Sequence, residues 1–86
     1  MSVTILKNLG AAQFAKPVEA AVRRAMAEAP GDWKVWIEES QGAVPWTIRL
    51  EGPAGFDWKY EFFGQEQTPA FIERKIKEEV AGHWPR

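Results

Sequence analysis

The sequence predicts an α+β fold in which two helices pack on one face of a three-stranded antiparallel meander. Three observations lead to this prediction. Residues 32–62 hold three runs in which apolar and polar side chains alternate, and short turn-forming segments separate these runs. Residues 17–29 and 69–81 instead carry apolar side chains at the spacing of a helix. Each helix has an apolar stripe and the sheet has an apolar face, so packing both helices on that face buries all three surfaces.

The length and composition indicate a single domain spanning residues 1–86. Within it, residues 16–82 form the expected helix–strand–strand–strand–helix core, residues 1–15 are an uncertain N-terminal segment, and residues 83–86 are a tail. The chain is rich in tryptophan, with five, and has no cysteine, so neither a disulfide nor a thiolate metal site can stabilise it. Burial of aromatic and aliphatic side chains must therefore provide the stability.

The first helix is expected to run from Pro17 to Ala29. Proline suits the first position of a helix, where its missing N–H costs no hydrogen bond, and Pro30-Gly31 provides the stop. The helix has an apolar stripe of mostly small side chains, formed by Val18, Ala21, Val22, Ala25, Met26 and Ala29. Small side chains let this helix lie close to the sheet that it covers.

The three strand-like runs are "DWKVWIEES" (32–40), "PWTIRLE" (45–51) and "FDWKYEFF" (56–63). Because side chains alternate between the two faces of a strand, each run places one tryptophan on a shared inner face. The inner face is expected to hold Trp33, Val35, Ile37, Trp46, Ile48, Leu50, Phe56, Trp58, Tyr60 and Phe62. The connections "SQGA" and "GPAG" are of hairpin length and rich in turn residues, which predicts a meander.

Residues 69–81 are expected to form the second helix. Thr68 is a good N-cap, Pro69 fits the first position, and Gly82 suits the C′ position that follows a helix. The apolar stripe of this helix consists of Ile72, Ile76 and Val80. Trp84, in the tail, is expected to fold back onto the edge of the domain.

The N-terminal segment leaves two alternatives open. Val3 and Ile5 alternate as in a short strand, which would add an extra, fourth strand to the sheet. Ile5, Leu6 and Leu9, before Gly10, instead follow the spacing of a helical turn.

Side chains that could support catalysis are sparse, and the sequence predicts no enzyme. The one histidine, His83, follows the end of the last helix, where a positive charge suits the helix dipole. A serine–histidine–aspartate arrangement would have to use Ser2 or Ser40 with His83, and neither serine lies in a nucleophile elbow. The adjacent carboxylates at 38–39 and 78–79 point in different directions on a strand or a helix. The sequence has no phosphate-binding glycine loop or metal-ligand spacing, so we expect no cofactor and no metal.

Charge and hydropathy bear on the classes of partner. The formal net charge is −1, which gives no general attraction to nucleic acid or anionic lipid. The sequence shows no signal peptide pattern and no apolar stretch long enough to span a membrane, so we expect a cytoplasmic protein with no membrane partner. Opposite charges on the helices are paired at i,i+4 spacing, as Glu19–Arg23, Arg24–Glu28, Glu73–Lys77, Arg74–Glu78 and Lys75–Glu79. A phosphate-binding surface would leave such cations unpaired.

The predicted order of elements is similar to that of double-stranded RNA-binding domains. Those domains place a cluster of lysines at the start of their last helix, where it meets phosphates. Residues 68–73 read "TPAFIE" and supply no lysine. Because similar topology alone does not imply function, we assign no membership of this family and expect no nucleic-acid partner on this basis.

Trp36 is the tryptophan of the three runs that this fold does not place in the core. The outer face of the sheet is expected to carry Lys34, Trp36, Glu38, Thr47, Arg49, Glu51, Asp57, Lys59 and Glu61. Depending on the register of the first hairpin, Trp36 lies opposite Arg49 or Thr47, and Arg49 can reach the indole in either case. One interpretation of Trp36 is surface packing under Arg49. Another is that the N-terminal segment crosses this face and buries it.

The leading functional hypothesis is a small non-catalytic protein-binding module, such as a subunit, an adaptor or an inhibitor, because tryptophan and arginine are favoured at interface hot spots. It would bind a partner protein or a second copy of the chain through Trp36, Arg49, Lys34, Lys59 and Phe63. The alternative is a nucleic-acid-binding module that stacks bases on Trp36 and contacts phosphates through Lys34, Arg49 and Lys59. A flat face of mixed charge does not resemble a small-molecule pocket.

Overall fold

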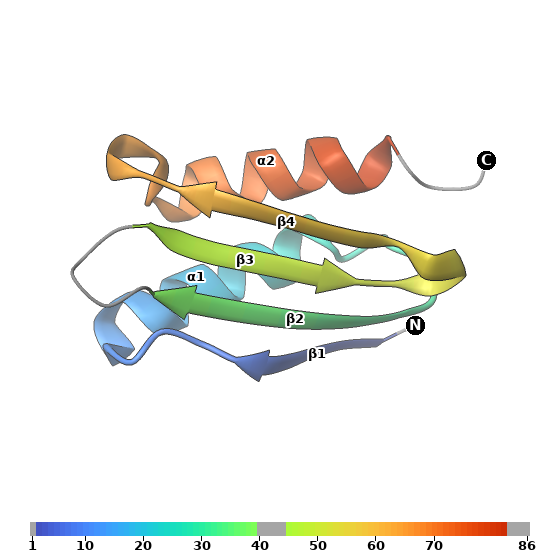
Figure 1. Cartoon of the computed structure of the whole chain (residues 1–86), viewed down its shortest axis with the longest axis horizontal. Helices are drawn as coiled ribbons and strands as arrows, with labels where there is room; N and C mark the ends of the chain where they lie inside the picture. The colour runs from blue at the N-terminus through green and yellow to red at the C-terminus, as the bar shows by residue number, and fades with distance from the viewer. Residues whose placement is uncertain (1, 40–44, 83–86) are drawn as a thin grey trace.

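The computed structural model describes residues 2–39 and 45–82 (Figure 1). Along the chain it contains β1 (Ser2–Lys7), α1 (Ala12–Ala25), β2 (Asp32–Glu39), β3 (Trp46–Glu51), β4 (Asp57–Phe62) and α2 (Pro69–Ala81). Short 3₁₀ turns at Pro53–Gly55 and Gly64–Glu66 flank β4. The expectations for the connection "SQGA", for Ser40, for His83 and for Trp84 lie outside the described residues.

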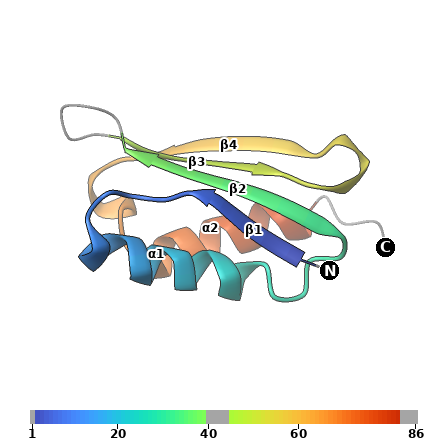
Figure 2. The same ribbon diagram turned by 90° about the horizontal axis from the view of Figure 1, so that it is seen from below.

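The four strands form one mixed sheet in the order β1-β2-β3-β4, and both helices lie on the same side of it (Figure 2). The β2–β3 and β3–β4 pairs are antiparallel, as the alternating runs predict. β1 is parallel to β2, with Ile5 paired to Val35. The α+β class with two helices is therefore confirmed. The prediction differs in detail, because the fourth, N-terminal strand that the sequence left open is present and pairs parallel to β2, so the sheet is mixed and only β2–β4 form the antiparallel meander.

The N-terminal segment forms a strand, not a helical turn. Val3 and Ile5 pack against the core from β1, whereas Leu6 is 52% exposed. The parallel partner of β1 is β2, which lies far along the sequence, since Ser2 pairs with Asp32. Such a pairing needs a crossover connection, which α1 provides here. The pattern within β1 is too short to reveal a partner at that separation.

α1 begins at Ala12 and not at Pro17. Pro17 lies inside the helix, where it has no N–H to donate to the carbonyl of Gln13. Gln13 is exposed, so water can take the hydrogen bond that this carbonyl lacks. Expecting proline only at the first position therefore placed the start of the helix too late.

α1 ends at Ala25 rather than Ala29, but its apolar stripe continues beyond the last turn. The Met26 N–H bonds to the Val22 carbonyl at 3.1 Å, and the Ala29 N–H bonds to the Met26 carbonyl at 3.0 Å. Met26 and Ala29 stay fully buried in the turn that follows. The buried face of this segment was predicted correctly although both boundaries were not.

α2 follows the prediction closely. The Thr68 hydroxyl accepts a hydrogen bond from the Phe71 N–H at 3.2 Å, and Pro69 is the first helical residue. Its apolar stripe is fully buried and consists of Ile72, Ile76 and Val80. Gly82 differs from the expectation, because its φ of −69° is right-handed, so the helix end does not need a left-handed residue there.

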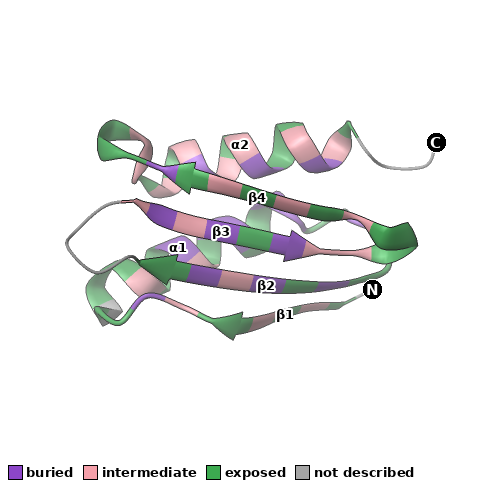
Figure 3. Ribbon diagram, in the orientation of Figure 1, coloured by how far each residue is buried: buried purple, intermediate pink, exposed green. Residues whose placement is uncertain are grey.

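The core lies between the sheet and the helices, and buried residues alternate with less buried ones along β2 and β3 (Figure 3). Trp33 and Trp46 are buried and Trp58 is half-buried against the core, so all three lie on the predicted inner face. The Trp33 indole N–H donates to the Pro30 carbonyl at 2.9 Å. Gly52 lies so close to the Trp33 ring that a Cβ there would overlap it.

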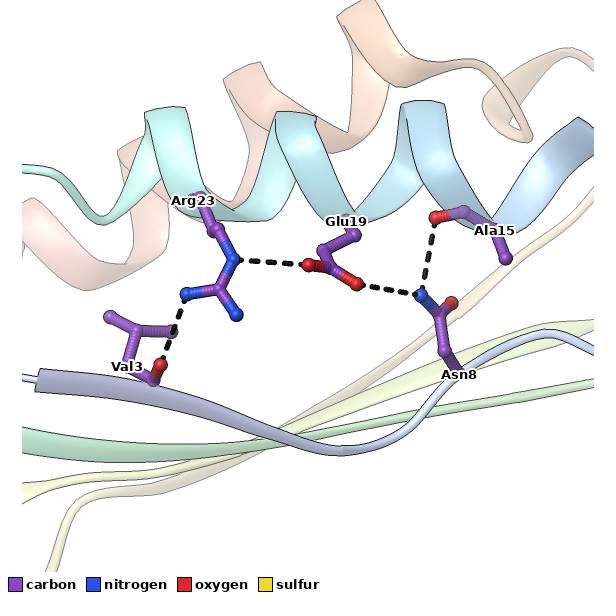
Figure 4. Close-up of polar contacts among 5 residues, drawn as sticks. All are labelled: Val3, Asn8, Ala15, Glu19 and Arg23. Atoms are coloured by element: carbon purple, nitrogen blue, oxygen red, sulfur yellow. Dashed lines mark hydrogen bonds and ion pairs between the residues drawn. The ribbon is translucent and has the colours of Figure 1, made fainter. Parts of the chain in front are cut away.

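A chain of polar contacts joins α1 to β1 (Figure 4). The Arg23 guanidinium donates to the Val3 carbonyl at 3.1 Å and to the Glu19 carboxylate at 3.2 Å. The Asn8 amide donates to the Ala15 carbonyl at 3.1 Å and to Glu19 at 3.5 Å. These contacts fix the helix against both ends of the strand.

Candidate binding surface on the outer sheet face

Trp36 lies on the outer face of the sheet, which is the face turned away from the helices. A row of paired residues crosses all four strands at this point and runs through Lys7, Trp36, Arg49 and Lys59. We call it the Trp36 row. Trp36 is half-buried, and the Arg49 Cζ atom lies 5.3 Å from the centre of its indole. The predicted contact between Arg49 and Trp36 is confirmed.

β1 extends the sheet beside β2 and does not cross the outer face (Figure 1). The alternative in which the N-terminal segment covers Trp36 is therefore wrong. A bulge between Ile5 and Lys7 brings Lys7 opposite Trp36 and leaves Leu6 exposed. Lys7 is a site residue that the sequence did not single out. The alternation of Val3 and Ile5 signals the strand, but not the bulge.

Arg49 is held in place by two carboxylates. Its Nε and Nη2 atoms each lie 3.3 Å from an oxygen of Asp57, and Nη2 also donates to Glu51. The hydrogen bond and charge of Asp57 raise the pKa of Arg49 above its ordinary value, with a smaller contribution from Glu51. Glu51 on β3 and Asp57 on β4 thus hold the guanidinium in a position where it covers one side of the Trp36 indole.

Acidic residues flank the Trp36 row on both sides. One neighbouring row pairs Lys34 with Glu51 and Glu51 with Asp57. The other neighbouring row consists of Glu38, Thr47 and Glu61. Glu38 lies 3.5 Å from the ammonium group of Lys7. The Trp36 row therefore carries positive side chains, and the two rows beside it are mainly acidic, with Lys34 as the exception.

The structure brings together only some of the residues that the sequence proposed for the site. Trp36, Arg49 and Lys59 share one row, and Lys34 lies in the adjacent row. Phe63 is 51% exposed but lies four residues beyond Lys59, which is about 13 Å along an extended chain. Phe63 is therefore remote from the indole of Trp36.

The helix side of the molecule has a shallow apolar hollow. It has a volume of about 260 Å³, and its lining includes Phe14, Pro17, Trp46 and Pro69. Phe14 is 47% exposed and its ring centre lies 5.8 Å from that of Trp46. This hollow is smaller than most small-molecule sites and lies on the opposite side of the sheet from Trp36.

The residues that the structure describes hold neither a metal cluster nor a helix able to span a membrane. Within residues 2–39 and 45–82, no three His, Cys, Asp or Glu side chains are grouped so that they could hold a metal ion. No helix in these two ranges is long and apolar enough to cross a membrane. Comparison of the chain with protein-family models, with curated proteins and with solved structures finds no match.

Proposed function

We propose that this protein is a small non-catalytic binding module that contacts another protein, or a second copy of itself, through the outer face around Trp36. One observation carries the proposal. Trp36 is half-buried on the outer face of the sheet, and Arg49, opposite it on β3, covers one side of its indole. Partly exposed tryptophans beside arginine are typical of residues that dominate the energy of protein interfaces.

The support of Arg49 by Asp57 and Glu51 strengthens this interpretation. A side chain that is already ordered loses little conformational entropy when a partner binds. Trp36 and Arg49 therefore offer a rigid anchor, and the positive row between two mainly acidic rows would select a partner with the complementary pattern.

The alternative is a nucleic-acid-binding module that stacks bases on Trp36 and contacts phosphates through Lys34, Arg49 and Lys59. The Trp36 row does align Arg49 and Lys59 with the indole. Asp57 and Glu51, however, occupy the guanidinium of Arg49 and would repel phosphates. For this reason we favour a protein partner.

The test compares wild-type protein with Trp36→Ala in affinity capture from a lysate of the source organism, with each sample divided and one half treated with nuclease. Phe14→Ala is the control, because it removes an exposed aromatic ring from the helix side, away from Trp36. We expect a captured protein whose affinity, measured afterwards with the purified partner or by self-association, falls at least tenfold in Trp36→Ala and is unchanged in Phe14→Ala.

Two outcomes would contradict the proposal. Capture that nuclease abolishes, with affinity falling steeply between 50 and 200 mM salt, would favour the nucleic-acid alternative. Equal capture by wild type and a correctly folded Trp36→Ala would identify Trp36 as surface packing.

A further inference from the structure

The sheet ends at β4 with a row of open backbone groups. The Gly52 N–H donates to the Phe56 carbonyl at 3.0 Å, so Gly52 and Phe56 are a hydrogen-bonded pair. Hydrogen-bonded pairs recur at every second residue of an antiparallel ladder such as β3–β4. The even-numbered residues of β4 therefore bond to β3. The N–H and carbonyl groups of Asp57, Lys59 and Glu61 point away from β3, and within the described parts of the chain no backbone group accepts from or donates to them.

The opposite edge of the sheet is blocked. The Ser2 N–H bonds toward β2, to the Gly31 carbonyl, so Val3 presents its backbone groups to the open side of β1. The Val3 carbonyl is already bonded to Arg23 (Figure 4). The bulge before Lys7 further interrupts β1. Bulges and capped carbonyls are devices that keep an edge strand from pairing, and β4 lacks a bulge in its register with β3.

The open part of β4 has a defined length. Beyond its end, the Phe63 N–H already donates to the Glu66 carboxylate at 3.1 Å. Before its start, the chain turns through Pro53–Gly55. An added strand can therefore pair with residues 57–61 only.

The two faces of this edge differ in chemistry. Asp57, Lys59 and Glu61 lie on the outer face, and their charges alternate. Trp58 and Tyr60 lie half-buried on the inner face, with their rings stacked at 5.9 Å. α2 lies beyond β4 at this edge of the molecule in Figure 1 and below the sheet in Figure 2, so it borders the inner side of the open edge.

We propose that β4 binds an extended peptide segment of a partner as a fifth, antiparallel strand. The peptide reads basic–apolar–acidic–apolar–basic. Its charged residues face Asp57, Lys59 and Glu61, and its apolar residues rest on Trp58 and Tyr60 beside α2. The β4 edge shares Lys59 with the Trp36 row, but it binds through the open backbone of β4 and not through the Trp36 indole, so neither proposal requires the other.

A single peptide strand fits this edge better than a second copy of the chain. A copy joined through its own β4 would bring its α2 to the same border of the sheet, where the α2 already present would meet it (Figures 1 and 2). An isolated strand brings no helix with it. Asp57 also bonds to Arg49, so Lys59 and Glu61 contribute most of the charge selection.

The probe is the peptide acetyl-GKVEVKG-amide, and the matched control is the charge-reversed acetyl-GEVKVEG-amide. Binding is measured from the amide chemical shifts of ¹⁵N-labelled protein. We expect the largest shifts at residues 57–61 and an affinity for the first peptide about tenfold above that for the second. In Lys59→Glu/Glu61→Lys protein the preference should invert. N-methylation of the three charged residues of the first peptide, which removes the donors that face β4, should abolish binding.

Several results would overturn the inference. These are equal affinities of the two peptides, a preference that does not invert in a folded double variant, shifts centred elsewhere, binding retained after N-methylation, or no binding of either peptide. Trp36→Ala protein should bind the first peptide as wild type does. A failure at the Trp36 surface is therefore distinguishable from a failure at the β4 edge.

Discussion

Tyr60 is the only tyrosine of the chain, and it lies between two charged side chains on the inner side of β4. Its hydroxyl donates to the Glu66 carboxylate at 3.0 Å, and the Lys75 ammonium lies 4.8 Å from the centre of its ring. The hydrogen bond to Glu66, with partial burial, raises the pKa of Tyr60 above its ordinary value of 10.0. Spectroscopic titration of tyrosinate therefore reports on this one site.

We predict that the tyrosinate absorbance of the native protein appears at a pH above 10, and that Glu66→Gln lowers the midpoint toward the ordinary value. The native state holds the phenolic proton more tightly than the unfolded chain does. Its contribution to stability is thus fully present below pH 10 and is lost as the pH rises through the native pKa. Urea unfolding across this range should show the fall, and Glu66→Gln should make it shallower. The same native midpoint in both proteins would contradict this assignment.

Lys75 titrates in the same direction and must be separated from Tyr60. Its hydrogen bond to Glu79 raises the pKa of the ammonium group above its ordinary value of 10.5. Its stabilising contribution is also lost at high pH. Glu79→Gln is therefore the control. It removes the hydrogen bond of Lys75 and should alter the pH dependence of unfolding, while the tyrosinate midpoint stays above its ordinary value because the bond from Tyr60 to Glu66 remains.

Individual residues were the most predictable part of the molecule. The period of two along a strand fixes which side chains share a face, so the inward positions of Trp33 and Trp46 followed from the sequence. The choice between Arg49 and Thr47 opposite Trp36 did not, because it depends on how many residues the hairpin uses. The role of Lys7 depends on a bulge, which no side-chain pattern in β1 encodes.

At the scale of elements, the cap of α2 has a measurable role. The Thr68 hydroxyl accepts a hydrogen bond from the Phe71 N–H, which is one of the donors without a partner in the first turn of a helix. We predict that Thr68→Ala lowers the free energy of unfolding by about 1 kcal/mol, and that Thr68→Ser, which keeps the hydroxyl, has a smaller effect. Urea unfolding of the three proteins measures both changes. Equal losses in both variants would show that the hydroxyl is not the cause.

Element boundaries were predictable only where a cap marks them. α2 has a threonine cap and a first-position proline, and its start was placed correctly. α1 has no side-chain hydrogen bond at its cap, Ala11, and carries Pro17 within the helix, so its start was placed too late. The sequence of β1 does not decide between two structures, because Val3 and Ile5 fit a strand while Ile5 and Leu6 also fit a helical turn.

At the scale of the whole molecule, one cluster of buried side chains connects the sheet with both helices. Ile76 of α2 is fully buried within that cluster. We predict that Ile76→Ala lowers the free energy of unfolding by about 2–5 kcal/mol. Tryptophan fluorescence and far-ultraviolet circular dichroism should report a single common transition. Transitions that separate in the variant would mean that α2 unfolds independently of the sheet.

The ion pairs between surface side chains were predictable only where both partners lie on the same helix. The ion pair between Arg24 and Glu73, at 2.8 Å, joins the two helices, whereas the sequence suggested that Arg24 pairs with Glu28. The i,i+4 pairs Glu19–Arg23, Glu73–Lys77 and Lys75–Glu79 did form. Local spacing predicts such pairs, whereas contacts between helices depend on a topology that the sequence showed only in part.

That topology was predictable up to its antiparallel hairpins, whose strands are neighbours along the chain. The parallel β1–β2 pair escaped prediction because its partners are remote, and the same remoteness has a consequence for protein synthesis. Ser2 meets Asp32 thirty residues later. At about 5–20 residues per second, the ribosome needs roughly 2–6 seconds to add that stretch. For those seconds the nascent β1 has no strand to pair with, and its exposed Leu6 is open to chaperones or to neighbouring chains.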